Sequence, residues 1–293
     1  MDLTTRIDQA LEAALSLSEA ADGPPRLAAA TRHAVFPAGA RVRPRLCLAV
    51  ALACGDDEPA LADAAAAAIE LLHCASLVHD DLPCFDNSPL RRGVPTLHVA
   101  YGERLAVLAG DALIVLAFQG LGEARTRQIG RLPRLLGLIG KGVGQPHGIV
   151  AGQAWECEPQ VSLRQYQRAK TGALFAAATM AGAAAAGGQP AQWRALGEWL
   201  GEAYQVADDI RDVAADPLLL GKPVGRDQAL GRPSVAAEQG LLGAVAYFHQ
   251  LVANAAAAVP DCSGAQRLRA LVRAESERLV PAAWCEELAR AAA

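Results

Sequence analysis

The chain has 293 residues, of which 52% are hydrophobic, 20% are charged and only 4% are aromatic. This balance excludes a disordered or collagen-like protein and provides enough apolar residues for one large core. With 27 basic and 31 acidic residues the formal charge is −4, which argues against wholesale binding to nucleic acid. A phosphate ligand would instead need a local cluster of cations.

Helical periodicity dominates the sequence, and clusters of glycine and proline separate the predicted helices. Alanine runs recur, and alanine favours helices over strands. No period-two pattern of convincing length occurs, so the sequence predicts one all-α domain over residues 1–293. In chain order we expect helices at 3–20, 27–35, 44–53, 61–79, 105–120, 131–143, 163–185, 192–213, 234–259 and 266–288, the last of which is expected to kink or split at Pro281.

Cysteine usage and the N-terminal sequence predict a soluble, cytoplasmic protein. The seven cysteines are scattered without a CxxC pair, which is typical of reduced thiols. The first residues show no signal-peptide pattern. An uncharged stretch runs from Thr171 to Trp193, but it is mostly alanine and glycine and is broken by Gly187-Gly188-Gln189-Pro190. It favours a packed core helix over a membrane span, and we expect no stable membrane insertion.

The strongest chemical signal is a pair of aspartate clusters on separate predicted helices. The first, Asp80-Asp81-Leu82-Pro83-Cys84-Phe85-Asp86, follows the long helix 61–79, and the second is Asp208-Asp209-Ile210-Arg211-Asp212. Asp208 and Asp212 are four residues apart, so their carboxylates share one helix face and repel each other. A bound Mg²⁺ offsets this repulsion, because it takes carboxylate oxygens together with water and ligand phosphates. One such pattern can arise by chance, whereas two on different helices indicate function.

Basic residues lie close to both clusters and at two predicted helix starts. Lysine is scarce, with three in the chain, so its positions carry more information than those of arginine. Each basic group alone would suit a solvated surface, but together they supply enough positive charge for two diphosphates between acidic helices. The basic residues concerned are Arg41, Arg43, Arg45, Arg91, Arg92, Lys170 and Lys222.

With these residues the sequence resembles the trans-polyprenyl diphosphate synthases. The stretch from Leu72 to Gly93 is similar to the first aspartate-rich region of that family, in the longer DDxxxxD form of bacterial members, and Gln205 to Asp212 is similar to the second. The resemblance extends from about Arg32 to Ser234. The runs 152–156 (Gly-Gln-Ala-Trp-Glu) and 170–175 (Lys-Thr-Gly-Ala-Leu-Phe) are similar to bacterial geranylgeranyl diphosphate synthases of carotenoid pathways.

The resemblance implies an all-α helical bundle around a central active-site cavity, and a homodimer. It also implies that isopentenyl diphosphate joins dimethylallyl, geranyl or farnesyl diphosphate head to tail. The allylic C–O bond ionises, the alkene attacks the cation, and a proton leaves to the released diphosphate, so no dedicated protein base is expected. The expected product is the C20 geranylgeranyl diphosphate, with the C15 farnesyl diphosphate as the alternative.

The resemblance assigns roles to individual residues. It implies three Mg²⁺ ions, with the second aspartate of each cluster, Asp81 and Asp209, orienting their ligands. Thr171 and Gln205 match positions whose oxygens face the developing allylic cation. The implied metal ligands are Asp80, Asp86, Asp208 and Asp212; the implied contacts of the allylic diphosphate are Arg91, Lys170 and Lys222; those of isopentenyl diphosphate are Arg43, His73 and Arg92.

Two positions depart from the family pattern. Ala40 stands where a lysine of the isopentenyl diphosphate site is usual, and Arg232, counted among the substrate contacts, stands where a lysine is common. Either Arg41 or Arg45 replaces the missing cation, or isopentenyl diphosphate binds more weakly.

Product length is expected to depend on small residues before the first cluster. Ala75 lies five residues before Asp80, about 7.5 Å along the helix, where farnesyl-forming bacterial relatives tend to carry an aromatic residue. Ser76 is also small, so the floor of the chain-binding tunnel is expected deeper, near Leu72 or on a neighbouring helix. The alternative is that Ala75 only packs a close helix contact.

Three other functions fit parts of the pattern. A metal phosphohydrolase of the HD type would use the dipeptide His79-Asp80, but the other histidines lack the required spacing and the second cluster has no role. A non-catalytic subunit of a heteromeric prenyl synthase fits Ala40, although such subunits commonly lose an aspartate cluster. A terpene cyclase would not need the second group of cations around Arg43 and Arg92.

Overall fold

The computed structural model describes residues 2–36, 39–160, 162–214 and 234–281. Lys222 and Arg232, two of the expected substrate contacts, lie outside these ranges. The helices are α1 (Leu3–Ser16), α2 (Pro25–Val35), α3 (Val42–Ala53), α4 (Pro59–Asp80), α5 (Leu97–Tyr101), α6 (Glu103–Gly122), α7 (Leu132–Val143), α8 (Ile149–Ala154), α9 (Leu163–Gln167), α10 (Ala173–Ala185), α11 (Arg194–Ala214), α14 (Val235–Ala257) and α15 (Ala265–Leu279).

Shorter elements connect these helices. Among the described residues the only strands are β1 (Leu90–Arg91) and β2 (Val94–Pro95), which form a small antiparallel pair. Three 3₁₀ turns, η1 (Ile129–Arg131), η2 (Trp155–Cys157) and η4 (Pro190–Trp193), and one π-helical turn, η3 (Arg168–Gly172), complete the described elements. The predicted all-α fold is therefore confirmed.

Most predicted helices form close to their expected bounds, and the differences have local causes. The first helix ends at Ser16 instead of continuing to residue 20. α4 begins at Pro59, because proline suits the first helical position, and it ends at Asp80 before Pro83. Inside α14, Gly240 has a φ of 72° and kinks the helix. The short helices α5 and α8 have too few turns to give a periodic signal and were not predicted.

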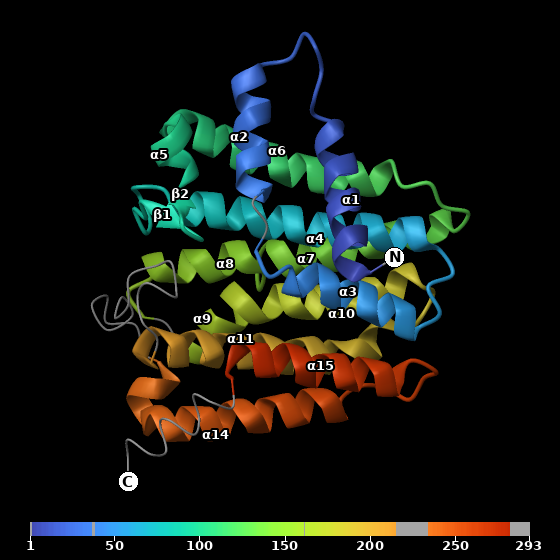
Figure 1. The fold of residues 1–293 in the computed structure, drawn as a ribbon, viewed down its shortest axis with the longest axis vertical. Coiled ribbons are helices and arrows are strands. Elements are labelled where there is room, and N and C mark those ends of the chain that lie inside the picture. The colour runs from blue at the N-terminus through green and yellow to red at the C-terminus, as the bar shows by residue number, and fades with distance from the viewer. Residues whose placement is uncertain (1, 37–38, 161, 215–233, 282–293) are drawn as a thin grey trace.

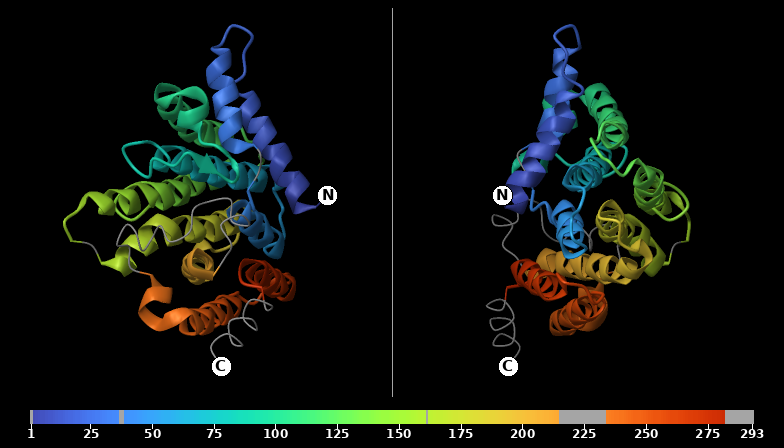
Figure 2. Two further views of the ribbon diagram at one scale, coloured as in Figure 1. Left: turned by 60° about the vertical axis from the view of Figure 1, so that its left-hand side comes forward. Right: turned by 90° about the vertical axis from the view of Figure 1, so that its right-hand side faces the viewer.

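The long helices lie side by side around α10. α10 packs against α3, α4, α7 and α11, while α6 covers α4 and α14 covers α11. Figure 1 shows these helices crossing the long axis of the molecule in succession, with α1 and α2 crossing them at one end, and Figure 2 shows several of them nearly end-on. Side chains from Leu174 to Ala185 are all buried, so the uncharged stretch forms the core helix that its composition predicts.

Among the residues that the structure describes, two helices are long and apolar enough, by length and composition, to cross a membrane. In α4 most of the apolar window is buried inside the protein, as expected for a core helix, whereas α6 leaves more of its apolar surface exposed.

The directions of the helices determine where the two aspartate clusters lie. α4 and α11 run the same way and both end at the left of Figure 1, where α10 begins. The two aspartate clusters therefore lie at one end of the bundle.

Candidate active site

The first aspartate cluster lies at the C-terminal end of α4, where the helix dipole disfavours negative charge. Arg91 on β1 compensates. Its Nε lies 2.8 and 2.9 Å from the two carboxylate oxygens of Asp81, and its Nη2 lies 2.7 Å from one of them and 3.6 Å from Asp80 Oδ2. Asp81 is buried, and this burial raises its pKa even though Arg91 acts in the other direction. Arg91 therefore makes a bidentate contact with Asp81, the buried one of the two adjacent aspartates.

The loop after α4 folds back onto the helix end. The backbone N–H of Asp86 donates to the carbonyl of Asp80 at 2.9 Å, and that of Ser88 donates to the carbonyl of Asp81 at 3.2 Å. This places the first and last aspartates of the cluster beside each other. The extra residues of the DDxxxxD motif therefore form one compact turn after α4.

The second cluster is fixed through its middle residue. Asp209 is buried; its Oδ1 accepts from Gln205 Nε2 at 3.0 Å, and its Oδ2 accepts from the backbone N–H of Val235 at 3.0 Å. Asp209 therefore holds the N-terminus of α14 against α11. Asp208 is half-buried and Asp212 is buried on the same helix.

Lys170 and Thr171, in the π-helical turn η3, connect the two clusters. Lys170 Nζ lies 3.4 Å from Asp80 Oδ1, and the hydroxyl of Thr171 donates to Gln205 Oε1 at 3.1 Å. Two consecutive residues, Lys170 and Thr171, thus contact Asp80 at the end of α4 and Gln205 on α11. π-helical turns inside α-helices often occur at functional sites. A chain of polar contacts therefore runs from Arg91 through both helices.

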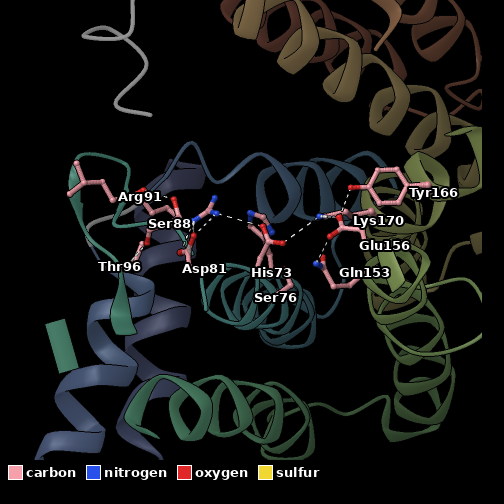
Figure 3. A network of polar contacts seen from close by, with 12 residues as sticks. His73, Ser76, Asp81, Ser88, Arg91, Thr96, Gln153, Glu156, Tyr166 and Lys170 are labelled. Carbon is pink, nitrogen blue, oxygen red and sulfur yellow. Dashed lines mark hydrogen bonds and ion pairs between the residues drawn. The ribbon is translucent and has the colours of Figure 1, made fainter. Parts of the chain in front are cut away.

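Lys170 has a second carboxylate partner. Its Nζ lies 2.6 Å from Glu156 Oε1, and Tyr166 and Gln153 contact the same glutamate. Figure 3 shows Lys170, Glu156 and Tyr166 on one side of His73, and Asp81 with Arg91 on the other. Burial acts to lower the pKa of Lys170, but the negative charges of Asp80 and Glu156 dominate and raise it. The ammonium is therefore protonated throughout the physiological range.

The residues expected to bind isopentenyl diphosphate form a separate cationic group. Arg43 Nη1 lies 3.3 Å from His73 Nε2, and a Cβ added to Gly39 would collide with the guanidinium of Arg92. Burial, reinforced by the charges of Arg43 and Arg92, holds the pKa of His73 well below its ordinary value. His73 is therefore neutral at pH 7 and accepts a hydrogen bond from Arg43 through Nε2.

Two aromatic contacts of this group were not predicted. The Arg43 guanidinium lies 4.5 Å from the ring centre of Phe175 and 5.5 Å from that of Tyr204. Such contacts stabilise a cation that has lost much of its water. Their positions in the sequence were a possible signal for these contacts: Phe175 is the last residue of the family-like run 170–175, and Tyr204 directly precedes Gln205.

The structure gives Arg41 and Arg45 other partners, so of the two alternatives raised by Ala40, weaker binding of isopentenyl diphosphate stays as the prediction. Arg41 is buried and pairs with Glu70 at 2.8 Å and with the carbonyl of Val35 at 2.9 Å. Arg45 pairs with Glu275 at 2.6 Å. Both guanidinium groups connect helices instead, which the alternating pattern in the sequence does not reveal.

The residues expected to set product length lie on different sides of α4. His73, Ser76 and Asp80 share one helix face by their spacing, and Ser76 is half-buried with its hydroxyl bonded to the carbonyl of His73 at 2.7 Å. Ala75 and Leu72 are buried in the main core. Ala75 lies outside the face of Asp80, so the floor of the tunnel stays a prediction.

The donor chemistry fits Mg²⁺. Within the described ranges no group of three or more His, Cys, Asp or Glu side chains lies close enough to hold a metal ion by itself. Mg²⁺ typically uses one or two protein carboxylates and completes its shell with water and substrate phosphates. Paired carboxylates on α4 and on α11 match that requirement better than a dedicated protein cage.

Comparisons with known proteins identify the class. The family model described as "Polyprenyl synthetase" matches residues 24–263, and the chain belongs to this family. The resemblance seen in the motifs is therefore confirmed.

Individual relatives agree. The chain is 50% identical over 282 residues to the geranylgeranyl diphosphate synthase of Cereibacter sphaeroides, covering 96% of this chain and 98% of that protein. It is 41% identical over 249 residues to the farnesyl diphosphate synthase of Geobacillus stearothermophilus, covering 80% and 83%. A crystal structure of a Helicobacter pylori geranyltransferase, complexed with magnesium and isoprenyl diphosphate, matches with a TM-score of 0.78 at 30% identity, covering 94% of this chain and 97% of that one.

Proposed function

We propose that this protein is a Mg²⁺-dependent prenyltransferase that condenses isopentenyl diphosphate with allylic diphosphates and releases mainly geranylgeranyl diphosphate. The observation that carries the proposal is the contact chain from Asp80 through Lys170, Thr171 and Gln205 to Asp209, which links both aspartate clusters at one end of the bundle. The relative in Cereibacter sphaeroides, at 50% identity over nearly its whole length, supports the C20 product.

The allylic diphosphate binds between α4 and α11. Asp80 and Asp86 on one wall, and Asp208 and Asp212 on the other, would hold Mg²⁺, three ions by family resemblance, and the bound ions would supply positive charge to the departing diphosphate. Lys170 and Arg91 add fixed positive charge on the α4 side, and Lys222 is assigned to the same diphosphate.

Bond cleavage leaves an allylic cation near the π-helical turn. The side-chain oxygens of Thr171 and Gln205 are already fixed by their mutual hydrogen bond of 3.1 Å, and Gln205 is held in turn by Asp209. Oxygen dipoles that are oriented before the reaction stabilise developing positive charge without reorganisation. Asp81 and Asp209 act as positioning residues, because each is buried and ties the following chain segment to its helix.

Isopentenyl diphosphate binds to Arg43, His73 and Arg92, with Arg232 as a further assigned contact. The neutral imidazole of His73 offers its second ring nitrogen as a donor, and the buried Arg43 supplies charge where water is excluded. The proton lost after condensation goes to the released diphosphate. Ala75, Ser76 and Leu72 set how long the product grows.

We infer further that the protein works as a cytoplasmic homodimer in carotenoid biosynthesis. α6 exposes Val107, Leu108 and Val115, and apolar residues of this kind gathered on one helix mark protein interfaces. Size-exclusion chromatography with light scattering tests the dimer: Leu108→Glu is expected to shift the protein toward monomer.

The decisive experiment incubates purified protein with Mg²⁺, isopentenyl diphosphate and farnesyl diphosphate, and identifies the products by chromatography. A C20 diphosphate that forms only with Mg²⁺ supports the proposal. Phosphate release without elongation would indicate a hydrolase, a cyclic hydrocarbon a cyclase, and no turnover a non-catalytic subunit. A second incubation with geranyl diphosphate distinguishes a C20 synthase from the second candidate, a C15 synthase like the Geobacillus stearothermophilus relative. A C15 synthase would stop after adding one isopentenyl unit.

A further inference from the structure

The segment from α8 to η2 contacts Lys170 from outside the aspartate clusters. We propose that Glu156 in this segment is a positioning residue that holds the Lys170 ammonium back from Asp80, and thereby keeps the Asp80 carboxylate available to a divalent cation. This inference rests on the proposed function, in which Asp80 is a metal ligand.

Distances show how the ammonium is shared. Lys170 Nζ lies 2.6 Å from Glu156 Oε1, which is a short charge-assisted hydrogen bond, and 3.4 Å from Asp80 Oδ1. Asp80 and Lys170 are partly buried, with side-chain exposed fractions of 14% and 21%, and the side chain of Glu156 is 23% exposed although the residue as a whole lies at the surface. Water screens the contact with Glu156 more than the part-buried contact with Asp80, and the position of the one cation decides which carboxylate it neutralises.

Glu156 is itself fixed in place by neighbours on both of its oxygens. The hydroxyl of Tyr166 donates to Oε1 at 2.6 Å, and Gln153 Nε2 donates to Oε2 at 3.0 Å. The ring of Tyr166 also lies under the ammonium, with Lys170 Nζ 5.5 Å from its centre. Figure 3 shows Gln153, Glu156, Tyr166 and Lys170 close together; they come from α8, η2, α9 and η3. Because the carboxylate is held by its own donors, it acts as a rigid acceptor for Lys170.

The backbone brings this acceptor close to Lys170. A Cβ added to Gly152 would collide with the backbone nitrogen and Cα of Lys170, so α8 packs directly against the π-helical turn. Glu156 then follows within the next turn of chain. The run 152–156 therefore has a use beyond its likeness to the family: its glycine permits the contact and its glutamate receives the ammonium.

Removing the negative charge of Glu156 leaves Asp80 as the nearer anion for Lys170. The ammonium then moves onto Asp80 and competes with a cation for the same oxygens. Glu156→Gln is expected to weaken Mg²⁺ binding in the presence of inorganic diphosphate by about tenfold, the equivalent of one charge-assisted hydrogen bond gained by the competitor. Tyr166→Phe keeps the ring but removes one of the two donors that hold the Glu156 carboxylate, and is expected to weaken Mg²⁺ binding by about threefold.

The experiment combines calorimetry with nuclear magnetic resonance on the full chain. Titration calorimetry measures Mg²⁺ binding with inorganic diphosphate present. The protein has three lysines, Lys141, Lys170 and Lys222, so lysine side-chain ¹⁵N labelling gives few signals, and Lys170→Arg assigns the relevant one. Glu158→Gln is the matched control, because it removes the charge of an exposed acid two residues away.

The expected result is a shifted Lys170 signal and weaker Mg²⁺ binding in Glu156→Gln, with both unchanged in Glu158→Gln. Equal or tighter Mg²⁺ binding in Glu156→Gln, or an unmoved Lys170 signal, would overturn the proposal. The calorimetric and spectroscopic results do not need turnover. If the wild-type protein bound Mg²⁺ and diphosphate as described but formed no prenyl product, the proposed function would fail while this inference stood.

Discussion

Helix α4 carries an acidic cluster at each end, and the two clusters are neutralised in different ways. The N-terminal cluster consists of Asp56, Asp57 and Glu58, which directly precede the helix. Arg6 Nη1 lies 2.6 Å from Asp56 Oδ2, and the two terminal nitrogens of Arg131 each lie 2.7 Å from an oxygen of Asp57. Glu58 accepts hydrogen bonds from the segment before η1. Each carboxylate has its own partner from a different part of the chain, and the helix dipole favours negative charge at this end.

At the C-terminal end of α4, by contrast, cations are shared between carboxylates. Arg91 is committed to Asp81 and only approaches Asp80 at 3.6 Å, while Lys170 is shared between Asp80 and Glu156. The helix dipole disfavours negative charge here, and the second aspartate cluster lies at the same end of the bundle. Cations that are shared between carboxylates, at a helix end that disfavours negative charge, indicate a site that can accept a further, mobile cation.

The largest expected effect comes from removing one charge at the C-terminal end. Asp80→Asn is expected to lower kcat for condensation by about a hundredfold or more, since a group that stabilises charge in the transition state is lost. Its thermal stability should not fall, because the substitution relieves repulsion at a helix C-terminus. Steady-state kinetics and thermal unfolding measure both. Asp57→Asn, at the other end, should keep wild-type turnover; an active Asp80→Asn enzyme would remove the distinction between the two ends.

A structural role at the N-terminal end predicts a loss of stability with activity preserved. Arg6 pairs with Asp56 and with Asp63, and its side chain is 10% exposed. Arg6→Met leaves two partly buried carboxylates without their cation, and is expected to cost about 2 kcal/mol in the free energy of unfolding. Denaturant titration measures this change. Arg32→Met is the control, because its pairs with Glu12 and Glu19 are exposed and should contribute little.

A third substitution tests how far the functional end extends along α4. Ala75→Phe adds an aromatic ring a turn and a half before Asp80, and is expected to shift the main product from C20 to C15. Chromatography of the products from geranyl diphosphate measures the shift. Overpacking in the core can destabilise Ala75→Phe, so Ser76→Phe, on the half-buried face shared with Asp80, provides a second variant. C20 formation by both folded variants would place the tunnel floor elsewhere.

The sequence predicted what depends on local pattern. Helix periodicity located the long helices, and the spacing of Asp208 and Asp212 identified a paired carboxylate face. It did not predict the π-helical turn at Lys170, because continuous helical periodicity runs through residues 163–185. That turn lies where Gly152 of α8 and Gly201 of α11 pack closely against it, which is a tertiary effect. The acceptor position of Glu156 depends on the same packing.

Long-range ion pairs were also beyond the sequence. Arg41 and Glu70 are 29 positions apart and meet only because α3 packs against α4. Alternating arginines at 41, 43 and 45 therefore looked equivalent. In the structure each has a different environment: Arg41 pairs with Glu70, Arg43 contacts His73 and two aromatic rings, and Arg45 pairs with Glu275.

The smallest expected effect is a pH dependence confined to the N-terminal end. Hydrogen bonds from Arg131 lower the pKa of Asp57 below its ordinary value of 3.8. Because the folded state has the lower pKa, ionised Asp57 stabilises the protein above pH 3.8, and this contribution is lost as the pH falls through the folded-state pKa. Since the side chain is 51% exposed, Asp57→Asn is expected to lower the melting temperature at pH 7 by only about 1–2 °C.

Melting curves of Asp57→Asn and the wild type at a series of pH values measure this contribution. The two curves should converge well below pH 3.8, and Asp22→Asn, at an exposed acid after α1, should follow the wild type throughout. The sign differs at the C-terminal end, because burial raises the pKa of Asp81, so its contribution to stability declines as the pH rises past 3.8. A Tm difference for Asp57→Asn that grows on acidification would mean that Asp57 resembles the buried aspartate of the functional end, and the contrast between the two clusters would fail.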